Sequence, residues 1–151
     1  MQGDCDAGYF CEGGASSAQP EGGLCPKGYK CVVGSAAPEP CPITEYQDLE
    51  GQSTCKPCTA GNYCTEEAML TCPAGYYCLA NNNKLPCPPG KFRTNTGASD
   101  ANDCTACTAG FACPSHAIIT PTIQCKAGYY CTGGAITDMP TSAAEGGGLC
   151  Q

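Results

Sequence analysis

The chain has 151 residues, 17 of them cysteine, with no tryptophan, three phenylalanines and a formal net charge of −7. Its apolar content is too thin to fill a core for this length, and a cysteine share above about 8–10% is typical of disulfide scaffolds. The acidic balance argues against nucleic acid and anionic membranes, which attract clustered Lys and Arg. Because disulfides persist in oxidising compartments, we expect an extracellular or cell-surface protein.

A seven-residue motif, Cys-x2-Gly-x2-Cys, occurs six times, at residues 5–11, 25–31, 58–64, 72–78, 107–113 and 125–131. An aromatic residue follows the glycine in most copies; in one copy Asn62 takes that place and Tyr63 carries the ring. Glycine at a fixed place suits a turn with positive φ. We predict tight turns with short extended flanks, each carrying a ring over a disulfide or over the next turn as a miniature core.

The cysteines also define a longer six-cysteine unit. Complete units have cysteines at 41, 55, 58, 64, 72 and 78, and at 87, 104, 107, 113, 125 and 131. This order predicts the C-terminal part of a module at 1–40, complete modules at 41–86 and 87–149, the second with a long final loop, and the start of another module at 150–151. We therefore expect the sequence to be a window from a longer secreted chain.

With 20 glycines and 13 prolines, helices of useful length are nearly excluded. The predicted fold class is small and disulfide-rich: tandem cysteine-rich modules with short β-hairpins and loops, forming an elongated rod with almost no helix. Tandem modules of this kind contact only their neighbours, so length grows with copy number.

All 17 cysteines are expected to form disulfides. They are Cys5, Cys11, Cys25, Cys31, Cys41, Cys55, Cys58, Cys64, Cys72, Cys78, Cys87, Cys104, Cys107, Cys113, Cys125, Cys131 and Cys150, the last with a cysteine outside this sequence. Adjacent pairing closes every seven-residue copy. Interleaved pairing joins successive copies, as in Cys58–Cys72 and Cys64–Cys78. A third scheme, with pairs such as Cys64–Cys72 and Cys78–Cys87, leaves both Cys-x2-Cys pairs without partners. The first two schemes share Cys41–Cys55 and Cys87–Cys104, which we predict.

Three motifs resemble a known family: Cys-Pro-Pro-Gly-Lys-Phe at 87–92, Cys-Thr-Ala-Cys at 104–107 and Cys-Pro-Ala-Gly-Tyr-Tyr-Cys at 72–78. They look like the ephrin-receptor-like cysteine-rich repeat and, more distantly, the cysteine-rich modules of tumour necrosis factor receptors. They are also similar to large repetitive surface and fibre proteins of protists and algae. The resemblance implies an extracellular disulfide-rich fold. Thr44 departs from it, because it replaces the glycine expected after Cys41.

Candidate metal and catalytic residues have simpler structural interpretations. The pairs Cys55–Cys58 and Cys104–Cys107 lack the second pair, about 15–20 residues on, that a zinc ribbon requires, so disulfides are favoured. His116 is the one histidine, and its neighbour Ser115 alone supplies no catalytic constellation. We expect no enzyme activity and no cofactor.

A polar loop offers oxygen ligands from Asn95, Asp100, Asn102 and Asp103. These residues do not match an EF-hand, so an Asx-type cap is favoured, with structural Ca²⁺ as the weaker alternative.

Hydroxyl groups near proline in the long loops are candidate O-glycan sites: Thr120, Thr122, Thr141 and Ser142. Plain linkers explain them equally well.

The predicted function is a non-catalytic structural segment of a repetitive cell-surface or filament-forming rod, whose partners are identical chains or further repeats. Ile118, Ile119 and Ile123 are candidates for an edge strand making such a contact, the alternative being a loop with buried isoleucines. The second hypothesis is a ligand-binding ectodomain of a receptor. A secreted inhibitor or toxin is less favoured, since such proteins usually use one compact module.

Overall fold

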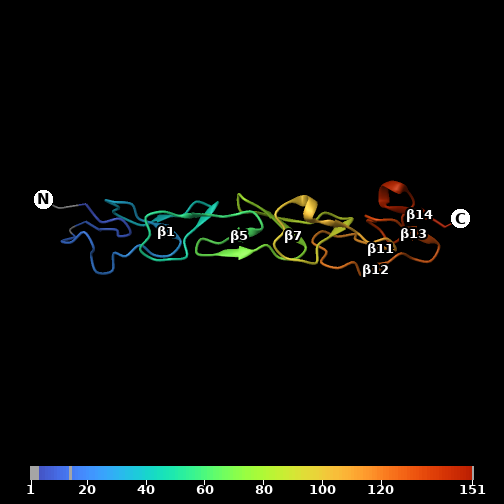
Figure 1. The fold of residues 1–151 in the computed structure, drawn as a ribbon, viewed down its shortest axis with the longest axis horizontal. Helices are drawn as coiled ribbons and strands as arrows, with labels where there is room; N and C mark the ends of the chain where they lie inside the picture. Colours follow the sequence, from blue (N-terminus) through green and yellow to red (C-terminus); the bar gives the residue numbers. More distant parts are fainter. Residues whose placement is uncertain (1–3, 14, 151) are drawn as a thin grey trace. The chain divides into compact units, whose positions relative to one another are not determined.

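Short hairpins joined by disulfide-closed turns make up the described chain (Figure 1). The computed structural model describes residues 4–13 and 15–150. Within them the helices are two three-residue 3-10 turns, η1 (Ala101–Asp103) and η2 (Ala143–Glu145). None of these described helices is long or apolar enough to cross a membrane. The predicted fold class, small and disulfide-rich with short hairpins and almost no helix, is confirmed.

Every strand pairs with its neighbour along the sequence, which gives seven two-stranded sheets in the described residues. The strands are β1 (Tyr29–Lys30), β2 (Glu39–Pro40), β3 (Glu45–Tyr46), β4 (Lys56–Pro57), β5 (Asn62–Cys64), β6 (Met69–Thr71), β7 (Tyr76–Leu79), β8 (Asn83–Pro86), β9 (Lys91–Phe92), β10 (Thr105–Ala106), β11 (Phe111–Ala112), β12 (Ile123–Gln124), β13 (Tyr129–Cys131) and β14 (Gly147–Leu149). A single bridge between Tyr9 and Leu24 continues this pattern at the first turn. The sheets stay small because glycine and proline interrupt each strand within a few residues.

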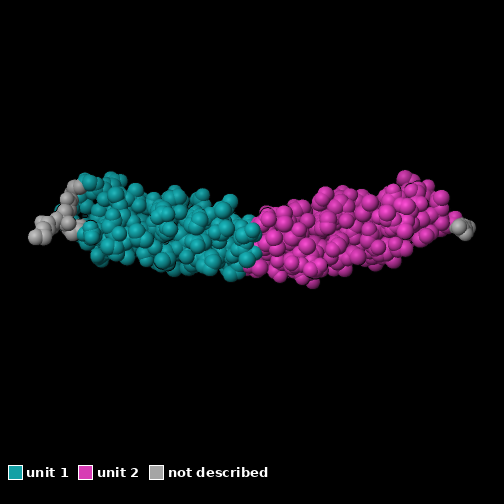
Figure 2. Space-filling view, turned by 90° about the horizontal axis from the view of Figure 1, so that it is seen from above, with its two compact units in different colours: residues 1–59, 63–70, 80–82 teal, residues 60–62, 71–79, 83–151 magenta. Residues whose placement is uncertain are grey.

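The chain divides into two compact units, coloured separately in Figure 2. Unit 1 comprises Met1–Thr59, Tyr63–Leu70 and Ala80–Asn82; unit 2 comprises Ala60–Asn62, Thr71–Leu79 and Asn83–Gln151. The predicted module boundaries follow the order of the cysteines, whereas the two units follow the packing of the chain. The module boundaries therefore stay a prediction.

The buried interior consists largely of cystine. Among the described residues, its apolar members are cysteines together with Pro140, Ala98, Ala112 and Ala135, and one polar residue, Gln47, is buried. The tyrosine and phenylalanine side chains are half-buried or exposed, with Tyr130 half exposed. The rings predicted to form miniature cores therefore flank the turns, and sulfur forms the innermost layer.

Eight disulfides follow the adjacent scheme. They are Cys5–Cys11, Cys25–Cys31, Cys41–Cys55, Cys58–Cys64, Cys72–Cys78, Cys87–Cys104, Cys107–Cys113 and Cys125–Cys131. Their Cα–Cα distances of 5.7–6.0 Å lie within the usual range for disulfides. The two long pairs are those shared by the adjacent and interleaved schemes. Cys150 is exposed and has no disulfide partner among the described residues.

The glycine of each seven-residue copy has a φ of 79–87°, as the turn prediction requires. Gly75 illustrates a second constraint, because a Cβ added there would lie 2.5 Å from the backbone oxygen of Ala117. Both the left-handed conformation and this close backbone approach favour glycine over any other residue.

A hydrogen bond between successive turns recurs along the chain. The carbonyl of the fourth residue of each turn accepts from the N–H of the cysteine that opens the next turn, at 2.7–3.0 Å. The pairs are Gly8–Cys25, Gly28–Cys41, Thr44–Cys58, Gly61–Cys72, Gly75–Cys87, Gly90–Cys107, Gly110–Cys125 and Gly128–Cys150. Each bond joins residues of one unit. The structural repeat is therefore the turn, which occurs eight times in residues 4–13 and 15–150, whereas the cysteine motif occurs six times.

Protease digestion without reduction distinguishes the pairing schemes. Cleavage after Glu66 by a glutamate-specific protease should separate the fragment that carries Cys58–Cys64 from the fragment that carries Cys72–Cys78, because no disulfide of the structure spans this position. Interleaved pairs Cys58–Cys72 and Cys64–Cys78 would keep the fragments together. Non-reducing electrophoresis and intact mass give the answer.

A cut after Glu50 is the internal control for this digestion. It lies inside the loop closed by Cys41–Cys55, as Glu45 does, so the segments that carry Cys41 and Cys55 should stay joined by that disulfide after both cuts. A species in which the Cys58 and Cys72 fragments stay joined after complete cleavage at Glu66 would contradict adjacent pairing.

Candidate functional site

Every third turn has a polar residue where the other turns have their closing cysteine. Gln47 and Arg93 stand there, in the turns that open at Cys41 and Cys87. The backbone N–H of each donates to a carbonyl just beyond the following turn, at 2.9 and 3.0 Å. Their backbones thus continue the same pattern as a second cysteine, although their side chains form no disulfide.

The two polar side chains make equivalent contacts. Gln47 Nε2 donates to the Thr54 carbonyl at 2.6 Å, and Arg93 Nη1 donates to the Asp103 carbonyl at 2.8 Å. Both acceptors come immediately before the cysteine that closes the long loop. Gln47 is 1% exposed, and its Oε1 accepts from the Leu49 N–H at 3.1 Å, so its buried amide is satisfied. Each side chain therefore holds the returning segment beside the disulfide.

Sequence reasoning missed this role of Gln47 and Arg93. A signal was available, because both residues lie six positions after a cysteine, as the closing cysteine does in the other turns. The equivalence is hard to recognise because neither residue is a cysteine. The two side chains have only a hydrogen-bond donor in common.

The hairpin beside Gln47 carries an exposed ion pair. Tyr46 of β3 lies opposite Lys56 of β4, whose ammonium is 5.9 Å from the centre of the Tyr46 ring. Lys56 also pairs with Asp48, and their hydrogen bond lowers the pKa of Asp48 and raises that of Lys56. Because both groups are solvent-exposed, the pair contributes little to stability.

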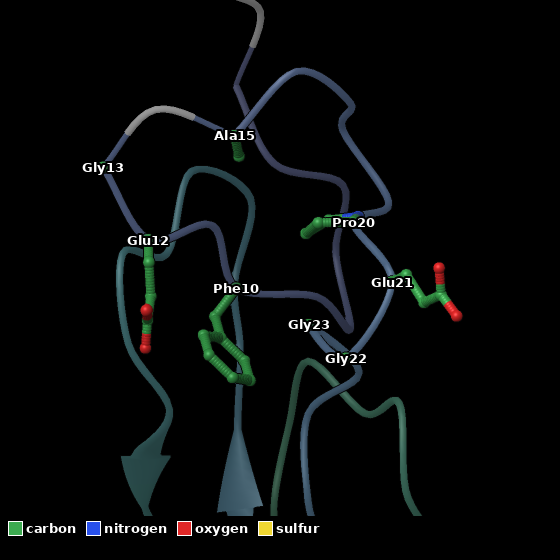
Figure 3. Close-up of a pocket in the computed structure, with 8 residues that line it drawn as sticks. All are labelled: Phe10, Glu12, Gly13, Ala15, Pro20, Glu21, Gly22 and Gly23. Carbon is green, nitrogen blue, oxygen red and sulfur yellow. The ribbon is translucent and has the colours of Figure 1, made fainter.

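A shallow hollow lies beside the first turn, within unit 1 (Figure 3). It encloses about 400 Å³ and is lined by Phe10, Glu12, Gly13, Ala15, Pro20, Glu21, Gly22 and Gly23. Figure 3 shows the carboxylate of Glu21 pointing away from the Phe10 ring. The residues that line this hollow do not form the cluster of converging polar groups that orients a substrate in most ligand sites.

A second hollow, of about 510 Å³ and within unit 2, follows the loop before β12. Ile118, Ile119 and Ile123 line it together with small residues and threonines, without a charged group. Ile119 is 51% and Ile123 41% exposed, so these side chains are not buried in the loop. The expected edge strand is limited to the two residues of β12, because Pro121 and the positive φ of Ala117 (58°) interrupt an extended run.

The polar loop around Asp100 forms a helix cap. Asp100 Oδ1 accepts from the Asn102 N–H at 2.8 Å, and Asp103 Oδ2 accepts from the N–H groups of Ser99 and Asp100 at 2.7 and 3.2 Å. The predicted Asx-type cap is therefore confirmed, as a reciprocal capping box on η1. These backbone hydrogen bonds lower the pKa of Asp103.

The candidate metal ligands are separated by the disulfides. Cys55 is bonded to Cys41, whereas its near neighbour Cys58 is bonded to Cys64. His116 lies exposed in a loop. Within residues 4–13 and 15–150, no group of three or more His, Cys, Asp or Glu residues is placed to hold a metal ion.

The four candidate O-glycan residues are exposed but differ in their contacts. Thr120 and Thr122 flank Pro121 at the second hollow. Thr141 donates its hydroxyl to Glu145 Oε2 at 3.0 Å, and Ser142 is the N-cap of η2. The N–H and hydroxyl of Thr141 lower the pKa of Glu145. Glycosylation of these residues stays a prediction.

Part of the chain is similar to part of a longer protein. No protein-family model matches the chain. It is 30% identical over 104 residues to an Arabidopsis thaliana protein named "Putative white-brown complex homolog protein 30". The match covers 57% of this chain and 9% of that protein, so this chain corresponds to a small part of the relative's length. The resemblance to ephrin-receptor-like repeats is independent of this match and stays a prediction.

Replacing the buried amide should weaken the third turn. Gln47→Ala removes the donor to Thr54 and the acceptor for Leu49, and we expect the free energy of unfolding to fall by about 1–3 kcal/mol. Gln52→Ala is the control, because that side chain makes only an exposed bond to Glu50. Denaturant unfolding under non-reducing conditions measures both variants, and equal losses would argue against the role of Gln47.

The capping box should make stability depend on pH. The pKa of Asp103 is lower in the folded chain, so its contribution is present above the ordinary carboxylate pKa and is lost as pH falls through the folded value. The destabilisation caused by Asp103→Asn at pH 7 should therefore shrink below about pH 4. Unfolding of both proteins at several pH values tests this, with Glu67→Gln as a charge-matched control. A difference that is independent of pH would contradict it.

Proposed function

We propose that the chain is a non-catalytic structural segment of an extracellular protein, in which disulfide-closed turns serve as a stiff spacer. The observation that carries this proposal is the repetition of one turn-to-turn hydrogen bond at eight turns around a cystine interior. Backbone geometry that repeats from turn to turn favours a mechanical role. The oxidising compartment that eight disulfides indicate is consistent with it.

Local closure explains how such a segment resists extension. Six of the disulfides join residues only six positions apart, so a pulling force cannot lengthen the chain inside those rings. The hairpins also join neighbouring strands. Force therefore acts mainly on the short segments between rings, and the damage from one opened segment stays local.

We propose that this spacer associates with identical chains. Exposed apolar side chains support it, among them Tyr130 and Leu149 on the β13–β14 hairpin and Ile123 on β12. Sedimentation at rising protein concentration tests this part of the proposal. Monomers across the whole range would count against it.

The alternative function is a ligand-binding receptor ectodomain. The hollow lined by Ile118, Ile119 and Ile123 favours it, because apolar concavities of this size are common in ligand sites. The relative in Arabidopsis thaliana is compatible with either function, since the match occupies 9% of a longer protein. Saturable binding of a partner, lost in the Ile119→Ser variant, would favour the receptor function.

Force spectroscopy tests the spacer proposal directly. In the oxidised chain, the contour length released on unfolding should exclude the residues held inside the eight rings. Adding a reductant should lengthen the released contour by about 3.3–3.6 Å for each residue freed. The same released length in both conditions would show that the disulfides do not limit extension, and the proposal would fail.

A further inference from the structure

One turn departs from the others at its fourth residue. The turn that opens at Cys41 has Thr44 there, and Thr44 is not among the described residues with positive φ. In the equivalent turn one period later, the N–H of Gly90 donates to the carbonyl of Cys113, the closing cysteine of the following turn, at 2.8 Å. The corresponding carbonyl for Thr44 is that of Cys64.

A side chain supplies the donor to this carbonyl. Asn82 Nδ2 donates to the oxygen of Cys64 at 2.9 Å, and the Cys64 N–H donates to Asn82 Oδ1 at 2.6 Å. Asn82 Nδ2 also donates to the oxygen of Ile43, the residue before Thr44, at 2.8 Å. All four residues belong to unit 1. One amide group thus connects the Thr44 turn to the closing cysteine of the next turn.

The backbone of Asn82 is suited to this task. Its φ is 59°, and asparagine enters this left-handed region more readily than other residues with a side chain. Other turns use backbone groups for the equivalent bond, as where the N–H of Cys113 donates to the carbonyl of Ala135 at 2.8 Å. At Cys64, the N–H of the closing cysteine donates instead to the side-chain oxygen of Asn82. Asn82 therefore replaces two backbone contacts of the repeat with one side chain.

We propose that Asn82 is a clamp that permits a non-glycine turn at Thr44. By bonding both backbone groups of Cys64 and the carbonyl of Ile43, it holds the Thr44 turn in position for the next hydrogen bond, from the Cys58 N–H to the Thr44 carbonyl. The clamp is a conformational device specific to this turn. It is independent of whether the whole chain acts as a spacer or as a receptor.

Asn82→Gly tests the clamp, because glycine keeps the positive φ and removes the amide. Amide hydrogen exchange is read at Cys58 and Gln47, whose N–H groups donate to Thr44 and Glu66 and not to Asn82, although the Cys58 sulfur lies 3.8 Å from Asn82 Oδ1. We expect exchange at both to accelerate by about tenfold or more, because the hydrogen bonds that hold the Thr44 turn are lost. Asn81→Gly, at the exposed neighbour, should leave these rates within about twofold, a small fraction of the cost of one hydrogen bond.

A second change distinguishes the clamp from a general packing role. Thr44→Gly in the Asn82→Gly background restores a glycine turn, whose N–H can donate to Cys64, and should recover most of the lost protection at Cys58. If Asn82→Gly does not fold, Asn82→Asp serves instead, since it keeps the acceptor for the Cys64 N–H and loses both donors. Unchanged exchange at Cys58 and Gln47 in the folded variant, or no rescue by Thr44→Gly, would overturn the proposal.

Discussion

Closure of small loops by disulfides is the constraint on which this structure depends. The chain buries cysteine sulfur and a few alanines where other domains bury leucine, isoleucine and phenylalanine. Apolar burial of that kind cannot offset the conformational entropy of ordering the backbone. A ring of about seven residues restricts the unfolded chain and contributes about 2–3 kcal/mol in the loop-entropy model, and the long loops contribute somewhat more. The hydrogen bonds between turns then fix how each ring follows the one before it.

The third turn of each period shows how polar side chains complement these rings. There the disulfide moves to a later cysteine, so the loop that it closes grows to a sequence separation of 14 or 17 residues. A longer loop has more freedom near its closing point, and Gln47 or Arg93 restrains it by bonding the residue next to that point. Asn82 acts on the same turn as Gln47, through the backbone of Cys64. Side chains that donate hydrogen bonds therefore support the turns where the disulfide pattern is least regular.

Residue identity and spacing carried most of what could be predicted about the fold. Cysteine and glycine at fixed intervals indicated the turns, the absence of long helices and the pairs Cys41–Cys55 and Cys87–Cys104. They left the choice between adjacent and interleaved pairing open, because both satisfy the same spacing. Gln47 had a signal in its six-residue distance from Cys41, but Asn82 was beyond prediction: its bond to Ile43 joins residues 39 positions apart, and nothing in the local sequence specifies it. The hollows likewise depend on how loops fold back, which composition does not determine.

Adjacent pairing also has a consequence for biogenesis. A chain with this many thiols has a very large number of wrong oxidation products, and their isomerisation is slow. Here most cysteines have their partner six residues later, so each of these rings is able to oxidise as soon as its segment enters an oxidising compartment, before the following thiols emerge. Vectorial translocation would then order the oxidation events, and the burden on disulfide isomerases would fall mainly on the two wide loops.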